Sequence, residues 1–287
     1  MFKKIMSGPM FWGSIILIIS QVLVFIVAFR ERVYVDTYQI SSPDVAVQFP
    51  LAYFFGAVVV WAVVLFFVPL KNLKIIFRVI FALLFAWGMF IVLVFFTPLY
   101  ACVVIAVICG MVWFFIPRVW LHNLLLIFAL AGIGAVFGFF LSPWTAMAFM
   151  LVVSVYDFVA VRFGFMMWMA EKLSGADTLP AFIIPAGNSR WNIKLGETRL
   201  KPQAELPAKR EYSILGGGDI GLALVLVVSV FFMLGFTHAV IVGFFSLLGL
   251  NGAYLIQCFW LKGKPIPAMP PITLLSLIGL LIVYYAL

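Results

Sequence analysis

Residues 213–234, SILGGGDIGLALVLVVSVFFML, form an apolar run of membrane-spanning length in which Asp219 is the single charged residue. About 20 consecutive apolar residues in a helix cross the roughly 30 Å of hydrocarbon in a bilayer. A carboxylate at a helix centre costs about 2.5–3.5 kcal/mol on insertion scales, and acids retained at that depth usually serve a function. This stretch therefore predicts a membrane helix that carries a functional acid.

The whole chain has the composition of a membrane protein. Of its 287 residues, 66% are hydrophobic and 10% are charged, whereas soluble domains carry about 25% charged residues. Lipid allows only helices and closed barrels, because the backbone must satisfy its own hydrogen bonds. The apolar runs are too long and too continuous for barrel strands. We therefore predict an all-α, polytopic fold.

Counting apolar runs of sufficient length predicts nine transmembrane helices. The expected spans are 11–29, 50–69, 75–96, 98–116, 121–140, 143–169, 213–234, 237–260 and 267–287. Pro98, the pair Ser142-Pro143 and the pair Thr237-His238 are the expected turns between neighbouring spans. Because the first run lacks a small-residue cleavage pattern, we interpret it as a span and not as a signal peptide.

The spans divide the chain into three parts. Residues 1–169 hold helices one to six, 170–212 form a loop, and 213–287 hold helices seven to nine. Within the loop, 179–185 is apolar and the alternating stretch 191–195 could form a short strand. A role in substrate access and a mobile solvated loop both remain open for this segment.

Lys and Arg placement predicts the orientation in the membrane. With the N-terminus in the cytoplasm, all of the 18 basic residues except Arg30 and Arg32 lie on the cytoplasmic side, as the positive-inside rule requires. The C-terminus is then extracytoplasmic and the loop 170–212 is cytoplasmic. The net charge of +8 reflects this topology and contact with anionic lipid headgroups. We expect no nucleic-acid partner.

The ten acidic residues fall into two groups. Eight lie in the two longer loops: Glu31, Asp36 and Asp44 outside, and Glu171, Asp177, Glu197, Glu205 and Glu211 inside. Asp157 and Asp219 remain, both within hydrophobic spans. At 1.5 Å per residue, Asp157 lies about 21 Å from the outer end of its span and Asp219 about 9 Å from the inner end of the next. Consecutive antiparallel spans usually pack together, so the two acids can share one site.

Three glycines, Gly216, Gly217 and Gly218, come directly before the second acid. Without a Cβ, they permit unusual backbone dihedral angles and close approach of another chain. This suits a site where a substrate helix must unwind.

Three short motifs resemble those of the presenilin and signal peptide peptidase family of intramembrane aspartyl proteases. They are Tyr156-Asp157 in the sixth span, Gly216-x-Gly218-Asp219 in the seventh, and Pro267-Ala268-Met269 at the start of the ninth. Their order, their spans and the helix count are similar to the family pattern over essentially the whole chain. Met269 stands where the family has Leu, an exchange of similar volume.

The resemblance implies that Asp157 and Asp219 are catalytic, with Tyr156, the three glycines, Pro267, Ala268 and Met269 supporting the site. Two carboxyl groups that face one another share a proton, so one can activate water while the other polarises the scissile carbonyl. No metal or organic cofactor is required. The orientation matches presenilins, which implies single-span membrane substrates with an extracytoplasmic N-terminus.

Two other functions use similar residues. A proton-coupled transporter or cation leak pathway would also need two midmembrane carboxylates, although paired discontinuous helices in related halves are not evident. A prepilin-peptidase-like protease also uses a GxGD acid but would be expected to show CxxC pairs. Compact loops favour a microbial cell-membrane protein. The sequence leaves the oligomeric state and the physiological substrate open.

Overall fold

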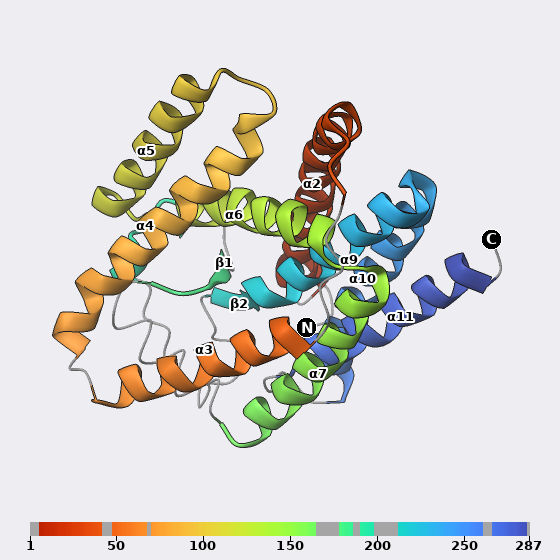
Figure 1. Ribbon diagram of the computed structural model, residues 1–287. Coiled ribbons are helices and arrows are strands. Elements are labelled where there is room, and N and C mark those ends of the chain that lie inside the picture. The colour runs from red at the N-terminus through yellow and green to blue at the C-terminus, as the bar shows by residue number, and fades with distance from the viewer. Residues whose placement is uncertain are drawn as a thin grey trace.

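In a computed structural model of the protein, the described residues are 6–41, 48–67, 70–164, 178–185, 190–197, 212–260 and 266–285. They form nine α-helices and a two-stranded sheet (Figure 1). The helices are α2 (Phe11–Tyr38), α3 (Gln48–Phe67), α4 (Leu70–Val94), α5 (Leu99–Phe115), α6 (Val119–Phe140), α7 (Pro143–Arg162), α9 (Gly217–Leu234), α10 (Phe236–Phe259) and α11 (Met269–Tyr285). The strands are β1 (Ala181–Pro185) and β2 (Tyr212–Gly216), and short helical turns lie at Met6–Met10 and Leu195–Glu197.

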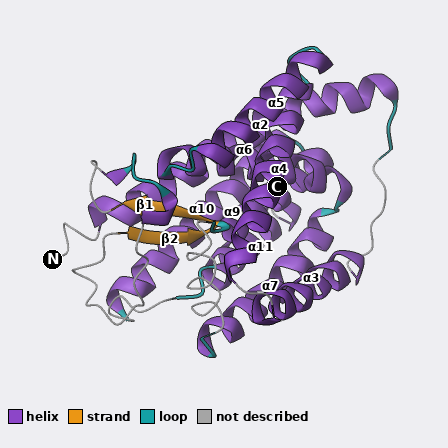
Figure 2. Cartoon of the chain, turned by 90° about the vertical axis from the view of Figure 1, so that its left-hand side faces the viewer, coloured by secondary structure: helices purple, strands orange, loops and turns teal. Residues whose placement is uncertain are grey.

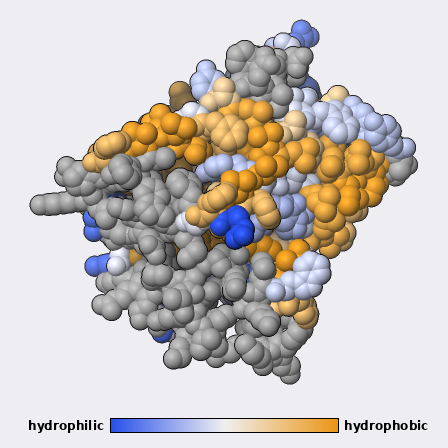
Figure 3. All heavy atoms as spheres, turned by 90° about the horizontal axis from the view of Figure 1, so that it is seen from below, coloured by the Kyte–Doolittle hydropathy of each residue, from blue (hydrophilic) through white to orange (hydrophobic). Residues whose placement is uncertain are grey.

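Six of the described helices are long and apolar enough to cross a bilayer. They lie at Gly8–Tyr38, Lys74–Val94, Val119–Phe140, Pro143–Arg162, Gly217–Leu234 and Phe236–Phe259, and shorter apolar helices lie at Pro50–Val60, Leu99–Phe115 and Met269–Tyr285. Seen from below, apolar side chains form a broad band across the described surface (Figure 3). The protein is therefore an integral, multi-pass membrane protein of mostly helical structure.

Helix α6 forms the centre of the bundle and packs on α2, α4 and α9 (Figure 1). Glycines make these close crossings possible, because lipid supplies no hydrophobic drive and helices associate by tight packing. A Cβ built on Gly134 would lie 2.9 Å from Cβ of Leu224 in α9, and one on Gly138 would overlap Val228. The helix that carries Asp219 thus lies directly against α6.

Local capping explains where two helices begin and end. The Oγ of Ser142 accepts a hydrogen bond of 3.2 Å from the N–H of Thr145, and Pro143 occupies the first turn of α7, a common arrangement at helix starts. Helix α9 ends at Gly235, whose φ of 95° is in the region that glycine tolerates. The predicted turn at Thr237-His238 is therefore wrong, since both residues lie in the first turn of α10.

The first helix is longer than the sequence predicts and buries a third acid. Helix α2 continues to Tyr38, so Glu31 and Asp36 belong to a helix and not to an outer loop, whereas Asp44 lies outside the described residues. The Glu31 side chain is 8% exposed and faces the bundle. The prediction that Glu31 and Asp36 lie in a loop was therefore wrong. The hydropathy of the sequence declines before the helix ends, so the apolar run underestimates the length of α2.

The loop between the sixth and seventh predicted spans contains ordered structure that packs on α6. β1 pairs antiparallel with β2, with Ala181 opposite Gly216 (Figure 2). The N–H groups of Val119 and Trp120, at the start of α6, donate to the carbonyls of Ile193 and Trp191 at 3.1 and 3.0 Å. The possible strand at 191–195 is reduced to a single bridge between Arg118 and Lys194. Helix α7 ends at Arg162, so the predicted span is too long at Phe163 and Gly164, which form a turn, and its last residues, 165–169, lie outside the described residues.

The crossing of α4 and α6 provides a test of the fold. A Cβ on Gly88 would overlap the backbone of Ala129, whereas one on Gly56 in α3 would meet nothing within 4 Å. We expect Gly88→Ala to destabilise the purified protein by about 1–3 kcal/mol through overpacking. Gly56→Ala should be neutral or stabilising by up to about 1 kcal/mol through helix propensity. Thermal unfolding in detergent measures both, and equal midpoints would contradict the packing of these two helices.

Candidate active site

Asp157 lies near the end of α7 and faces the interior of the bundle, with 4% of its side chain exposed. Its Oδ2 accepts a hydrogen bond of 3.2 Å from the backbone N–H of Met269, 112 positions away in the chain. A buried carboxyl group needs such a partner because desolvation is costly. The contact brings the first predicted acid and the PAL-like segment into one place.

The donor in this contact comes from the start of a helix. Met269 is the first residue of α11, and the first N–H groups of a helix have no partner within it. The next two residues, Pro270 and Pro271, have no N–H at all. Met269 therefore presents a main-chain donor that is free to bind Asp157. Pro267 and Ala268 precede the helix and are half-buried.

Asp219 lies in the first turn of α9, which packs on α7. Its half-buried carboxyl group accepts a hydrogen bond from the backbone of Gly216 and interacts electrostatically with Asp157. The N-terminus of α9 adds the positive end of a helix dipole beside this carboxyl. The two acids thus lie within electrostatic reach of one another, each with a backbone donor.

The three glycines before Asp219 have different surroundings. A Cβ on Gly216 would lie 2.7 Å from Oδ2 of Asp219, and one on Gly217 would lie 2.9 Å from the carbonyl oxygen of Pro180. Gly218 is exposed, and a Cβ there would meet nothing within 4 Å. None of the three has a positive φ. The expected unusual dihedral angles are therefore absent. Backbone crowding leaves no room for a side chain at Gly217, and a side chain at Gly216 would displace the Asp219 carboxyl group.

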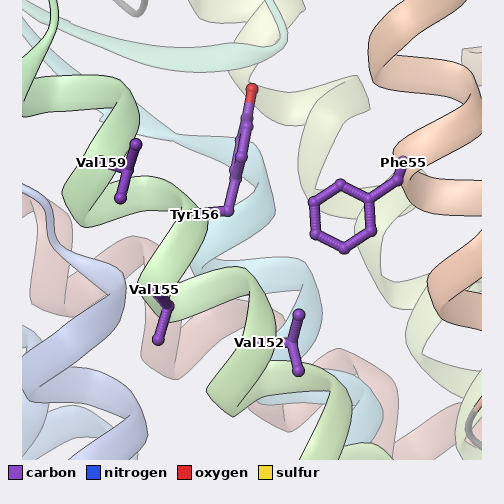
Figure 4. Close-up of a pocket in the computed structure, with 5 residues that line it drawn as sticks. All are labelled: Phe55, Val152, Val155, Tyr156 and Val159. Carbon is purple, nitrogen blue, oxygen red and sulfur yellow. The ribbon is translucent and has the colours of Figure 1, made fainter.

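The ring of Tyr156 packs against α3, while the side chain also interacts electrostatically with the neighbouring Asp157. Its ring makes edge contacts with Phe54 and Phe55, at centroid distances of 5.6 and 6.1 Å. A pocket of about 370 Å³ lies between the two helices. It is lined by Phe55 of α3 and by Val152, Val155, Tyr156 and Val159 of α7 (Figure 4). The Tyr-Asp pair thus places one side chain in an apolar pocket at the edge of the bundle and the next one inside.

Sequence reasoning missed one polar group near this site. The hydroxyl of Tyr254, in α10, is buried without a hydrogen-bond partner among the described residues. The Tyr254 side chain interacts electrostatically with Asp219, and its hydroxyl oxygen lies 2.6 Å from a Cβ built on Gly13 in α2. The only signal in the sequence is a phenol within an apolar span, which is too common to identify a site.

The arrangement can perform acid–base chemistry. Two carboxyl groups in electrostatic contact hold one proton between them, so one accepts a proton while the other donates. Among the described residues there is no group of three or more His, Cys, Asp or Glu side chains that could bind a metal ion. The structure thus brings together Asp157, Asp219, Gly216 and Met269, while the half-buried Tyr156 lines the pocket beside α3 (Figure 4) and Gly218 is exposed.

Comparisons with known proteins bear on the family and on the fold. The sequence model of a family described as signal-peptide peptidase, presenilin aspartyl protease matches residues 14–287. Two solved structures of a presenilin family intramembrane aspartate protease, in space groups C222 and P2, have the same fold, with TM-scores of 0.65 and 0.62 at 17% identity. Each match covers 97% of this chain, and 100% and 98% of the respective solved chains. A comparison with curated proteins gives no match.

The adjacent glycines before Asp219 allow a test that is independent of activity. Gly217→Ala would push a Cβ against the Pro180 carbonyl, whereas Gly218→Ala would project into open space. We expect Gly217→Ala to lower the free energy of unfolding by about 1–3 kcal/mol. Gly218→Ala should leave it unchanged or raise it by up to about 1 kcal/mol. Unfolding in detergent compares the two, and a more stable Gly217→Ala variant would show that the hairpin does not lie against α9 as described.

Proposed function

The chain belongs to the signal-peptide peptidase and presenilin aspartyl protease family, and from this premise we propose that Asp157 and Asp219 are its catalytic dyad. The observation that supports the proposal is that two acids on adjacent helices, α7 and α9, interact electrostatically inside an apolar bundle. Each acid has a main-chain donor: Met269 for Asp157 and Gly216 for Asp219. The substrate is then a peptide bond within a transmembrane segment.

The proposed reaction needs only these two side chains and water. One carboxylate removes a proton from water, whose oxygen attacks the carbonyl carbon of the scissile bond. The protonated partner donates to the carbonyl oxygen, and a proton then passes to the leaving nitrogen as the C–N bond breaks. The location of the shared proton is a property of the coupled pair and not of one residue. No metal ion or organic cofactor takes part.

We propose that this enzyme is an aspartyl endopeptidase of the GxGD class, and the Gly216-x-Gly218-Asp219 segment supports this. In our proposal, Gly216 leaves room for the Asp219 carboxyl group, which lies where a Cβ would otherwise be. Gly218 is exposed beside the acid, so an incoming backbone can approach the acid closely there. The two glycines therefore serve the catalytic acid and the substrate respectively.

Strand β2 offers the main chain of a substrate a place to bind. In an antiparallel ladder the N–H and C=O of one residue point to the same side. The N–H and C=O of Ile183 both bond Asn123 of α6 and therefore point away from β2. Ile214 lies directly opposite Ile183, so the N–H and C=O of Ile214 point away from β1, toward the outer edge of β2. An extended peptide can add to this edge, five positions before Asp219.

We propose the pocket between α3 and α7 as the lateral route from the bilayer. It is apolar, it lies at the membrane-facing edge of α7, and one of its walls is Tyr156, the neighbour of Asp157. A transmembrane helix in lipid can contact Phe55, Val152 and Val155 without exposing polar groups. Tyr156 would then mark the boundary between the lipid-facing route and the site.

We further propose that all nine apolar helices cross the membrane of a microbial cell, with the N-terminus in the cytoplasm. The distribution of Lys and Arg supports this orientation. Strand addition is directional, because donors and acceptors along β2 have a fixed order. The orientation of the enzyme therefore selects single-span substrates with an extracytoplasmic N-terminus.

The dyad is tested by replacing each acid. We expect Asp157→Ala and Asp219→Ala each to reduce cleavage of a purified single-span reporter by more than roughly 10⁴-fold, with no further loss in the double variant. Asn at either position should also be inactive, since it cannot exchange the proton. Glu31→Gln, which removes a buried carboxyl elsewhere, is the matched control and should retain cleavage. Full activity in either Asp variant would refute the site, and proton or ion flux in liposomes without cleavage would favour a transporter.

Substrate orientation is tested with two reporters that carry the same transmembrane segment in opposite directions. We expect preferential cleavage of the reporter with its N-terminus outside. Cysteine labelling at Gly8→Cys, in a background without the three native cysteines, reports the enzyme's own orientation and should require access from the cytoplasm. Preferential cleavage of the opposite reporter, or labelling of Gly8→Cys from outside, would overturn the orientation without affecting the dyad.

A further inference from the structure

The edge of β1 that faces α6 is paired by side chains and not by a strand. The Nδ2 of Asn123 donates to the carbonyl of Ile183 at 2.7 Å, and the N–H of Ile183 donates to Oδ1 of Asn123 at 3.0 Å. Two residues earlier on the same edge, Nε2 of His122 lies 3.1 Å from the carbonyl of Ala181. The Asn123 and His122 side chains are 5% and 0% exposed.

The chemistry of a primary amide explains why Asn serves here. Its side chain carries one carbonyl and one NH₂ group, so it can reproduce both hydrogen bonds of a residue in a strand ladder. In an apolar interior the N–H and C=O of Ile183 would be costly to leave unpaired. A one-residue slip of β1 would turn both groups away from α6 and toward β2. The Asn123 pair therefore specifies the register of β1 against α6.

The position of β1 in turn influences the position of Asp219, the proposed catalytic acid. β1 holds β2 with Ala181 opposite Gly216, and the carbonyl of Pro180 accepts a 3.0 Å hydrogen bond from the N–H of Gly217, at the start of α9. Gly216 in turn bonds the Asp219 carboxyl. A continuous series of hydrogen bonds thus runs from α6 through β1 to Asp219.

We propose that Asn123, with His122 beside it, is a positioning residue that sets the register of the hairpin relative to the dyad. It thereby determines which peptide bond of a substrate reaches Asp157 and Asp219. This inference rests on the proposed function, since the substrate is taken to pair with the outer edge of β2. Asn123 itself touches neither the substrate nor the acids.

The chain contains a matched control for this role. Asn251 in α10 joins two helices, whereas Asn123 joins a helix to a strand. Asn251 accepts a hydrogen bond of 3.0 Å from Ser14 in α2, and its Nδ2 donates to the carbonyl of Leu247. It is partly buried and has no contact with the hairpin among these bonds. Asn123→Leu and Asn251→Leu therefore make the same chemical change in two places, and only one of them holds β1.

The experiment uses the full-length protein in detergent and a single-span reporter whose products are identified by mass spectrometry. For Asn123→Leu we expect new cuts displaced by two residues, the smallest slip that keeps each side chain on its face. We also expect kcat per folded enzyme to fall by ten- to roughly a hundredfold with KM little changed, as misplacement of about 1 Å can cause. Asn251→Leu should retain the wild-type cut positions.

Two further measurements separate the possible failures. Asn123→Asp keeps the acceptor for the Ile183 N–H and nearly the same shape, and desolvation favours its neutral carboxyl, which can also donate to the Ile183 carbonyl. It should therefore fold even if the Leu variant does not, with a smaller displacement of the cuts. Hydrogen exchange at residues 181–185 should accelerate in both Asn123 variants and not in Asn251→Leu. Wild-type cut positions in the folded Asn123 variants would overturn the positioning role alone, whereas a wild-type protein without cleavage would refute the proposed function.

Discussion

The hydrogen bond from the N–H of Met269 to the carboxyl group of Asp157 joins two groups that an apolar bundle could not otherwise accommodate. A helix start leaves N–H groups without partners, and lipid offers no water to satisfy them. A buried carboxyl group faces the same problem from the acceptor side. Each group supplies the hydrogen-bond partner that the other lacks, at 3.2 Å. The first residue of α11 must therefore lie beside the Asp157 side chain of α7. The position of α9 then follows, since it packs on both helices.

Helix α6 provides the other half of this framework. Gly134 and Gly138 allow α9 to approach it closely, while its first residues hold the loop through the N–H groups of Val119 and Trp120. Asn123 adds the pairing with β1. Helix α6 therefore contacts the body of α9, the strand β1 that pairs with β2, and the segment 190–197. The placement of Asp219 thus depends on elements outside the candidate active site, as is typical of well-supported functional groups.

Much of the fold could be predicted because its main signals are local. The apolar runs indicated the helices, and the resemblance to the presenilin and signal peptide peptidase family was confirmed by the match over residues 14–287. The meeting of Asp157 with Met269 could be anticipated only from that resemblance. The β1–β2 pairing joins residues far apart in the chain, such as Ala181 and Gly216, and the Asn123 pairing joins residues 60 positions apart, which no local pattern reveals. The true end of α2, beyond Glu31, was missed because hydropathy measures lipid preference and not helix continuity.

The outward edge of β2 has a consequence for how such an enzyme could discriminate between substrates. A strand edge binds main-chain groups, which are the same in every residue except proline. A transmembrane helix must give up its own i to i−4 hydrogen bonds before it can offer those groups. On the proposed function, the energetic cost of local melting would then rank substrates more strongly than side-chain identity does. Selectivity would then depend on the helix–coil equilibrium of the substrate, because the five residues of β2, Tyr212–Gly216, bind only an extended chain.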